Sequence, residues 1–236
     1  MGSTVTGVAT SPAGRPLAPP RGAAIAGVIF SLLMIVGFGI TRSAVPADLT
    51  QPDVWLTQPD RRAAVRFALN LVPFAGIAFL WFMGVLRDRL GELEDRFFAT
   101  VFLGSGLLFV ACLFGAAAMS GALIEVAAAG NLRSPDSATL YFGRRATDAF
   151  LNLFAMKMAG VFMISTCTIG LRSAIFPRWI AFVGYACALV LLLVIANWKW
   201  IALVFPLWML LISMQILLAE FRSRFDGDAA AGAAVP

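Results

Sequence analysis

The sequence predicts an all-α polytopic transmembrane helical bundle of about six helices, and three observations support this. Of 236 residues, 60% are apolar and 13% are charged, whereas soluble domains hold about 45–50% apolar and about 25% charged residues. The mean hydropathy is +0.87. The apolar residues also form runs close to the roughly 20 residues that a helix needs to cross a hydrocarbon core about 30 Å thick.

Three regions follow from the distribution of these runs. Residues 1–20 are rich in Ala, Gly, Pro, Ser and Thr, so this segment cannot form a core and is predicted to be disordered. The predicted transmembrane domain covers residues 21–221, and residues 222–236 are predicted to be a disordered tail. The predicted spans are residues 22–40, 63–86, 97–123, 149–170, 180–196 and 201–219.

The first span carries Ala23, Gly27 and Ser31 on one ridge, and small residues at this spacing predict a close contact with another helix. A secretory signal peptide is the alternative, because Val45-Pro46-Ala47 resembles a cleavage site. The apolar stretch is longer than the roughly 7 to 15 residues of a signal core, which favours a retained helix.

A short repeat precedes the second span, because the five residues 49–53 (Leu-Thr-Gln-Pro-Asp) recur as residues 56–60. In each copy Thr is a good N-cap, Pro fits a first turn, and Asp favours the positive end of the helix dipole. The first copy therefore predicts a short interfacial turn that carries Trp55, and the second copy predicts the start of the second span.

The second span places Arg62, Arg66 and Asn70 on one helical face, and Pro73 is predicted to kink it. The charged residues 87–96 that follow must lie in water. The third span has a stripe of small residues that leads towards Glu125 and predicts a packing seam: Gly104, Ala111, Gly115, Ala118 and Ala122.

The fourth span follows a helix-start signal at residues 134–136 and contains Lys157. Its polar run, residues 165–168, is predicted to satisfy backbone carbonyls or to bond across helices. A tight turn with two tryptophans, residues 197–200, separates the last two spans and suits the membrane interface. Lys and Arg number nine on one side of the membrane and seven on the other, a bias that predicts cytoplasmic N- and C-termini.

Several functional classes receive no support from composition. The chain has no histidine, so it lacks the commonest metal ligand, haem ligand and general base. Its cysteines lie singly inside apolar runs, which indicates neither a zinc site nor a disulfide framework: Cys112, Cys167 and Cys187. We therefore expect no catalytic residue, no metal and no cofactor. The basic residues are scattered, which argues against nucleic acid as a partner.

Six polar residues near or inside the spans are the candidate ligand or ion-pair residues: Lys157, Arg66, Glu125, Asn70, Asp148 and Asn152. A charge inside a membrane is costly and marks a functional candidate by default. Lys157 lies about 12 Å into its span, where it either serves binding or transport or locks two helices by reaching a carbonyl or carboxylate. Arg66 is close enough to the end of its span to reach the interface.

The predicted topology places these six residues towards one side of the bilayer, so the second, third and fourth spans are expected to line a polar vestibule. There, Glu125 or Asp148 would neutralise Arg66 or Lys157. Asp148 and Lys157 are nine residues apart and differ in direction by about 180° on an ideal helix. They can face one cavity only if the helix is distorted.

Residues 81–91 (Trp-Phe-Met-Gly-Val-Leu-Arg-Asp-Arg-Leu-Gly) and 96–100 (Arg-Phe-Phe-Ala-Thr) resemble a group of uncharacterised multi-pass bacterial inner-membrane proteins. The resemblance covers the second and third spans. It implies a location in the bacterial cytoplasmic membrane and brings no known activity or site residues with it.

Three functional hypotheses follow. The favoured one is a non-enzymatic accessory or binding protein that works within the bilayer, with lipid, another membrane protein or a second copy of the chain as partner. The second is a small transporter or channel subunit that uses the vestibule, although we find no inverted repeat of broken helices, the strongest sequence pointer to a carrier site. The third is an intramembrane lipid-modifying enzyme with an Asp or Glu as base.

Overall fold

The chain forms a helical bundle in the computed structural model, which describes residues 21–45, 54–90, 96–128, 137–173, 177–193 and 200–233. Every regular element within these residues is a helix. In chain order they are α1 (Arg21–Ala44), α2 (Val54–Thr57), α3 (Pro59–Leu90), α4 (Arg96–Ala128), α5 (Ser137–Asp148), the π-helical segment η1 (Ala149–Ala155), α6 (Met156–Ser173), α7 (Arg178–Leu193) and α8 (Ile201–Ala233).

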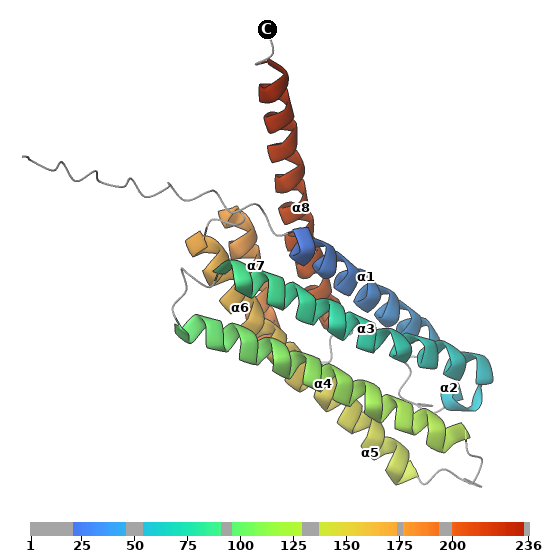
Figure 1. The fold of residues 1–236 in the computed structure, drawn as a ribbon. Coiled ribbons are helices and arrows are strands. Elements are labelled where there is room, and N and C mark those ends of the chain that lie inside the picture. Colours follow the sequence, from blue (N-terminus) through green and yellow to red (C-terminus); the bar gives the residue numbers. More distant parts are fainter. Residues whose placement is uncertain are drawn as a thin grey trace, which may run out of the picture.

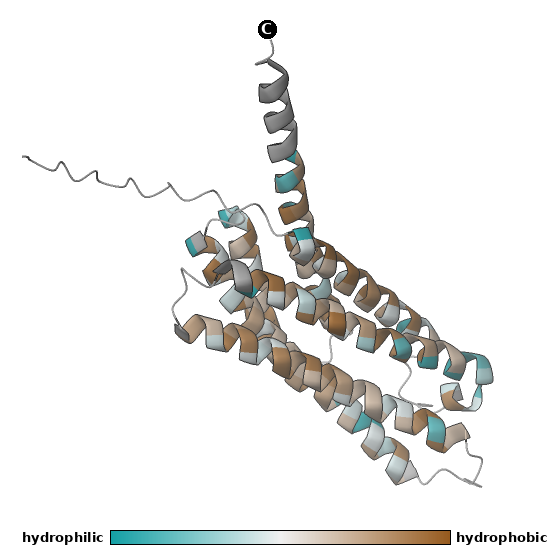
Figure 2. Cartoon of the chain, in the orientation of Figure 1, coloured by the Kyte–Doolittle hydropathy of each residue, from teal (hydrophilic) through white to brown (hydrophobic). Residues whose placement is uncertain are grey.

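Five helical segments are long and apolar enough to cross a membrane: α1, α3, α4, the continuous segment from α5 through α6, and α8. Helix α7 is also apolar but has only 16 residues. Figure 2 shows hydrophobic residues along the lengths of these helices and hydrophilic residues towards their ends. These observations confirm the predicted all-α polytopic bundle of about six spans and identify a multi-pass membrane protein.

The helices enclose one main core. Helix α1 packs against α3 and α8, α3 also packs against α4, and α4 packs against α6. Helix α7 lies against α6 and also touches α8. Figure 1 shows α1, α3 and α4 running side by side, with α5 along α4 and α2 at the end where α3 begins. The contact between α1 and α8, the first and last helices, therefore closes the arrangement around the core.

Several helices extend beyond the predicted spans. Helix α3 begins at Pro59, before the predicted span but where the second copy of the repeat predicted a helix start, and α4 continues to Ala128, close to the helix end predicted near residue 129. Helix α7 runs from Arg178 to Leu193, whereas its span was predicted over residues 180–196. Apolarity marks where a chain crosses lipid, whereas helical hydrogen bonds continue into water until a capping or breaking residue ends them. Residues 194–196 lie outside the described residues.

The largest differences are in the fourth and sixth spans. The fourth was predicted to begin at residue 149, but the helix already begins at Ser137, as the helix-start signal before it indicated. The sixth was predicted to end at residue 219, yet α8 continues to Ala233, so the disordered tail predicted over residues 222–236 is helical as far as 233. This extension is rich in alanine, the best helix former, and lacks proline. The predicted disordered segment 1–20 lies outside the described residues.

The second copy of the repeat contains the start of α3 at Pro59, as predicted, whereas the first copy, residues 49–53, lies outside the described residues and directly precedes α2. Trp55 and Leu56 lie in α2 and are buried, and α3 begins two residues after α2 ends. Arg62 donates from Nη1 to the Leu56 carbonyl at 2.7 Å, which satisfies an acceptor at the end of α2. A second, smaller core forms here from α1, α2, α3, α4 and α5: Ala44, Trp55, Leu56, Val65, Ile124 and Leu140.

The small-residue ridge on α1 is a close helix contact, as the sequence predicted. Ala23, Gly27 and Ser31 are all buried. Gly27 lies directly against the Ser213 side chain of α8, and a Cβ placed on Gly27 would collide with the Ser213 hydroxyl. Ser31 donates its hydroxyl hydrogen to the Gly27 carbonyl at 2.7 Å. The absence of a side chain at residue 27 therefore sets how closely α1 approaches α8.

Replacing Gly27 with alanine is expected to lower the stability of the bundle by about 1 kcal/mol, because the added methyl group overpacks the α1–α8 contact. Gly39→Ala on the same helix is the matched control, since nothing lies within 4 Å of a Cβ at that position. Thermal unfolding in detergent should show a lower midpoint for Gly27→Ala alone. Equal midpoints for the two variants would contradict the close contact.

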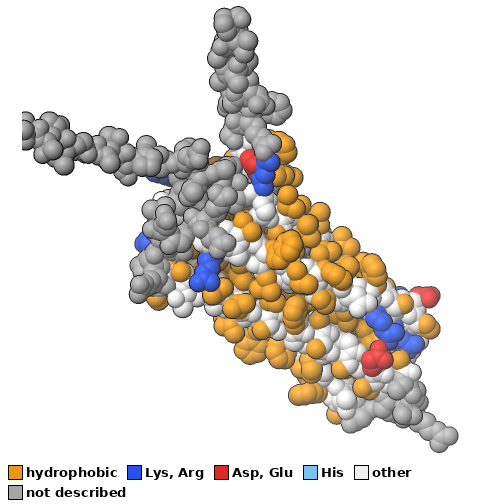
Figure 3. Space-filling model, in the orientation of Figure 1, with side chains coloured by type: hydrophobic (Ala, Val, Ile, Leu, Met, Phe, Trp, Pro, Cys, Tyr) orange, Lys and Arg blue, Asp and Glu red, His pale blue; other side chains and the backbone are white. Residues whose placement is uncertain are grey.

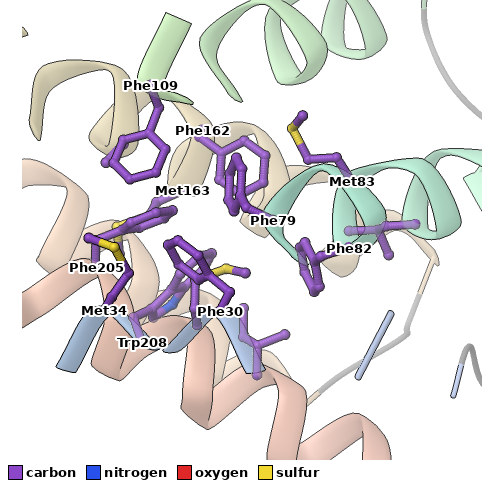
Figure 4. Close-up of a cluster of buried hydrophobic side chains, with 14 of the residues drawn as sticks. Phe30, Met34, Phe79, Phe82, Met83, Phe109, Phe162, Met163, Phe205 and Trp208 are labelled. Atoms are coloured by element: carbon purple, nitrogen blue, oxygen red, sulfur yellow. The ribbon is translucent and has the colours of Figure 1, made fainter. Parts of the chain in front are cut away.

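Five phenylalanines occupy the centre of the main core, one from each of α1, α3, α4, α6 and α8: Phe30, Phe79, Phe109, Phe162 and Phe205. None of them is exposed. We call this group the phenylalanine hub, and Figure 4 shows its rings directed towards one another. The ring centroid of Phe79 lies 5.0 to 5.8 Å from the ring centroids of the other four phenylalanines. These separations are in the range of favourable aromatic pairs.

Candidate functional site

An ion pair joins α3 to α4. Arg66 donates from Nη2 to Oε1 of Glu125 at 2.6 Å. Both side chains remain exposed, by 53% for Arg66 and 70% for Glu125. The sequence had left open whether Glu125 or Asp148 would neutralise Arg66, and the structure assigns this contact to Glu125.

Arg66 lies at the edge of the hydrocarbon core. Twenty residues without a charge, 67–86, separate Arg66 from Arg87 on α3, which is about the length that crosses the core. If Arg87 lies at one interface, Arg66 and its partner Glu125 therefore lie at the other.

A groove of about 460 Å³ opens between α3 and α4 beside this ion pair. Its polar lining consists of Arg66, Asn70 and Glu125. The remainder comes from α3 and α4 and is apolar or small: Leu69, Val72, Pro73, Phe114, Ala117, Ala118, Gly121 and Ile124. Three of the six candidate residues therefore meet at one groove, and part of the small-residue stripe of α4 lines it.

Pro73 interrupts the hydrogen bonding of α3 beside this groove. Proline has no backbone N–H, so the helical hydrogen bond that would reach the carbonyl of Leu69 is missing from α3. Helix α3 nevertheless continues through Pro73 to Leu90. Leu69 and Pro73 both line the groove, one turn apart.

Lys157 lies elsewhere and connects two helices. Its Nζ donates to the carbonyls of Leu191, at 3.2 Å, and of Leu192. These carbonyls belong to the last described turn of α7. Lys157 on α6 therefore contacts α7 through backbone carbonyls, which is the kind of contact that its predicted helix-lock role requires.

Asp148 and Asn152 do not line the groove, and this corrects the predicted vestibule. Both are exposed, with Asp148 at the end of α5 and Asn152 in η1. The vestibule was predicted to involve three spans, but the groove is lined by α3 and α4. Segment η1 packs against α4 instead, where Phe150 lies 3.1 Å from a Cβ placed on Gly115. The packing of this neighbouring segment could not be deduced from helical periodicity alone.

The distortion that the sequence considered between Asp148 and Lys157 is present as η1. A π-helical turn holds more residues than an α-helical turn. Seven π-helical residues therefore change the direction of the side chains of α6 relative to those of α5. Lys157 faces α7, as its contacts show.

Sequence reasoning missed a second ion pair, which Arg21 on α1 forms with Glu220 on α8. The Glu220 side chain is buried, whereas that of Arg21 is 40% exposed. An acidic residue at the end of the last apolar run was the available signal. The pairing required knowledge that α1 lies beside α8, which local sequence does not supply.

Other polar groups inside the spans serve the backbone, as predicted. Ser165, Thr166 and Thr168 donate their hydroxyl hydrogens to the carbonyls four residues earlier, at 2.8 to 3.1 Å. The Thr168 hydroxyl also lies 2.8 Å from that of Tyr185 on α7. These residues stabilise α6 and its contact with α7.

The charged side chains are concentrated at the ends of the bundle. Figure 3 shows blue and red side chains at both ends of the visible face, with hydrophobic side chains covering the length between them. This is the pattern of a protein that spans a bilayer and exposes its charges at the two interfaces.

Comparison with known proteins adds no relative: no family model, no curated protein and no solved structure matches the chain.

Proposed function

We propose that the protein is a non-enzymatic binding protein of the bacterial cytoplasmic membrane, with its termini in the cytoplasm, and that it takes its ligand from the bilayer through the α3–α4 groove. One observation carries the proposal. The polar candidates that meet one another lie in a groove on the side of the bundle, whereas the bundle centre is filled with aromatic rings.

The phenylalanine hub favours binding at the side over passage through the middle. Its five rings come from five helices and are completely buried. A solute path along the bundle axis would have to separate these helices and break ring contacts of 4.8 to 6.2 Å. A ligand that enters the groove from lipid requires no such movement.

The groove has the mixed chemistry of a binding site. Binding sites are generally concave and largely apolar, with a few polar groups that fix the orientation of the ligand. Here Arg66, Asn70 and Glu125 provide charge and hydrogen bonding, and Val72 and Phe114 provide apolar surface. The resemblance of residues 81–100 to multi-pass bacterial inner-membrane proteins supports the location.

Filling the groove tests this proposal. Gly121→Leu should expel the ligand, because Gly121 lines the groove and nothing lies within 4 Å of a Cβ there. The protein would be purified in a gentle detergent from its own membrane, and co-purifying proteins and lipids would be measured by mass spectrometry. A cost of about 1.4 kcal/mol for the intruding side chain corresponds to about a tenfold loss of a bound species.

Gly84→Leu is the matched control, because Gly84 is exposed on α3, has the same open space and does not line the groove. Both substitutions introduce the same side chain into a helix and raise its intrinsic propensity equally. A species lost from Gly121→Leu and retained by Gly84→Leu is the expected result. Identical co-purified species in both variants and the unchanged protein would refute binding at the groove.

A further inference from the structure

The chemistry of the groove identifies a class of ligand, and this inference rests on the proposed function. We propose that the groove binds a zwitterionic phospholipid with a primary ammonium headgroup, of the phosphatidylethanolamine class. The lipid phosphate lies against Arg66, the lipid ammonium group lies against Glu125, and an acyl chain follows the apolar part of the groove.

The depth of the ion pair suits a headgroup. Arg66 and Arg87 bracket one hydrocarbon thickness on α3, with 20 uncharged residues between them. Arg66 and Glu125 therefore lie at the level of phospholipid headgroups. From this level the groove continues along α3 past Asn70 to Pro73, towards the interior of the bilayer.

The two charges complement a zwitterion and keep hydrogen-bonding capacity. Their mutual contact uses Nη2 of Arg66 and Oε1 of Glu125. The structure gives no other hydrogen bond to either side chain among the described residues. Arg66 thus keeps donors for a phosphate, and Oε2 of Glu125 can accept from an ammonium group. A guanidinium group suits phosphate particularly well.

The rest of the groove suits the glycerol and acyl regions of the same lipid. Leu69 and Asn70 line the groove next to Arg66 along α3, and Asn70 offers a side-chain amide there. Farther along, Val72, Phe114 and Ala118 offer apolar surface. Polar and apolar features thus follow one another in the order in which a phospholipid presents them.

The arrangement also distinguishes between lipid classes. An anionic headgroup without an ammonium group would place a negative charge near Glu125 with no compensating contact. A quaternary choline group carries no N–H to donate to the carboxylate. Of phosphatidylethanolamine, phosphatidylglycerol and phosphatidylcholine, only phosphatidylethanolamine supplies both a phosphate acceptor and an ammonium donor.

The experiment uses the full chain purified in detergent and stripped of lipid. Phosphatidylethanolamine, phosphatidylglycerol and phosphatidylcholine with identical acyl chains would be titrated, and bound lipid would be counted by native mass spectrometry. We expect phosphatidylethanolamine to bind about tenfold more tightly than either of the others, as for one charge-assisted hydrogen bond. Glu125→Gln should abolish this preference and favour phosphatidylglycerol, whereas Arg66→Gln should weaken binding of all three.

Glu125→Asp keeps the charge and should keep the preference, which separates the effect of charge from any effect on folding. Equal binding of the three lipids by the unchanged protein, or a preference that persists in Glu125→Gln, would overturn the lipid assignment. The proposed function fails differently, through co-purified species that do not respond to Gly121→Leu. A protein partner that is released by Gly121→Leu, together with equal lipid binding, would retain the groove and reject the lipid.

Discussion

Phe79→Ala is expected to destabilise the bundle by about 3–5 kcal/mol, the range for removing a large side chain from a well-packed core. Phe79 has no exposed surface and its ring is paired with four others in the phenylalanine hub. Each aromatic pair contributes about 0.5–1.5 kcal/mol beyond the burial of area. The resulting cavity would be enclosed by five helices, so lipid cannot enter to fill it.

Phe74→Ala is the matched control, because Phe74 lies on the same helix and is 63% exposed on the bundle surface. Substitutions at such positions usually change stability by less than about 0.5 kcal/mol. Unfolding by SDS titration in mixed micelles, followed through tryptophan fluorescence, compares the two variants with the unchanged protein. If both variants lose the same stability, the hub is not the central packing element of the fold.

Lys157→Met is expected to lower stability by about 1–3 kcal/mol, since hydrogen bonds to charged groups contribute about that much. Methionine preserves the length of the side chain but cannot donate to the Leu191 and Leu192 carbonyls. The last turn of α7 would then lose its partner on α6. Membrane insertion should be unaffected, because methionine is more favourable than lysine in lipid.

Lys157→Arg is the control for charge and donors, and it should recover most of the stability that methionine loses. Thermal unfolding in detergent measures both variants. Hydrogen exchange gives a second readout, because loss of the Lys157 hydrogen bonds should raise amide exchange at the end of α7 and leave exchange in α1 unchanged. An unaltered melting midpoint together with unaltered exchange would show that Lys157 does not secure α7.

The sequence predicts the fold class well because lipid imposes it. Long apolar runs, charged connections and paired helix-start signals are local features, and a bilayer leaves helices as the main way to satisfy the backbone of such runs. The second copy of the repeat, residues 56–60, illustrates this, since its capping chemistry predicts the start of α3 at Pro59. Helix ends are less predictable, as α8 shows by continuing to Ala233.

The candidate site was only partly predictable, because its contacts depend on which helices are neighbours. Spacing on one face grouped Arg66 with Asn70, the predicted topology put Glu125 towards the same end, and all three residues line the α3–α4 groove. The same reasoning included Lys157 in this polar group, but its side chain reaches α7 instead. Periodicity within one helix does not reveal that α6 lies against α7, and this contact determines where the lysine side chain points.

The π-helical segment η1 has a consequence for how the chain tolerates change. It joins two helical pieces whose contacts are made independently, with Leu140 of α5 in the small core and Phe162 of α6 in the phenylalanine hub. Because a π-helical turn holds more residues than an α-helical turn, deleting one residue from 149–155 would let α-helical winding replace π-helical winding and keep α5 and α6 close to their present phase. The same deletion inside α5 or α6 would rotate one piece by about 100° relative to the other. The chain is therefore expected to tolerate the loss of a residue from η1 better than from the helices on either side of it.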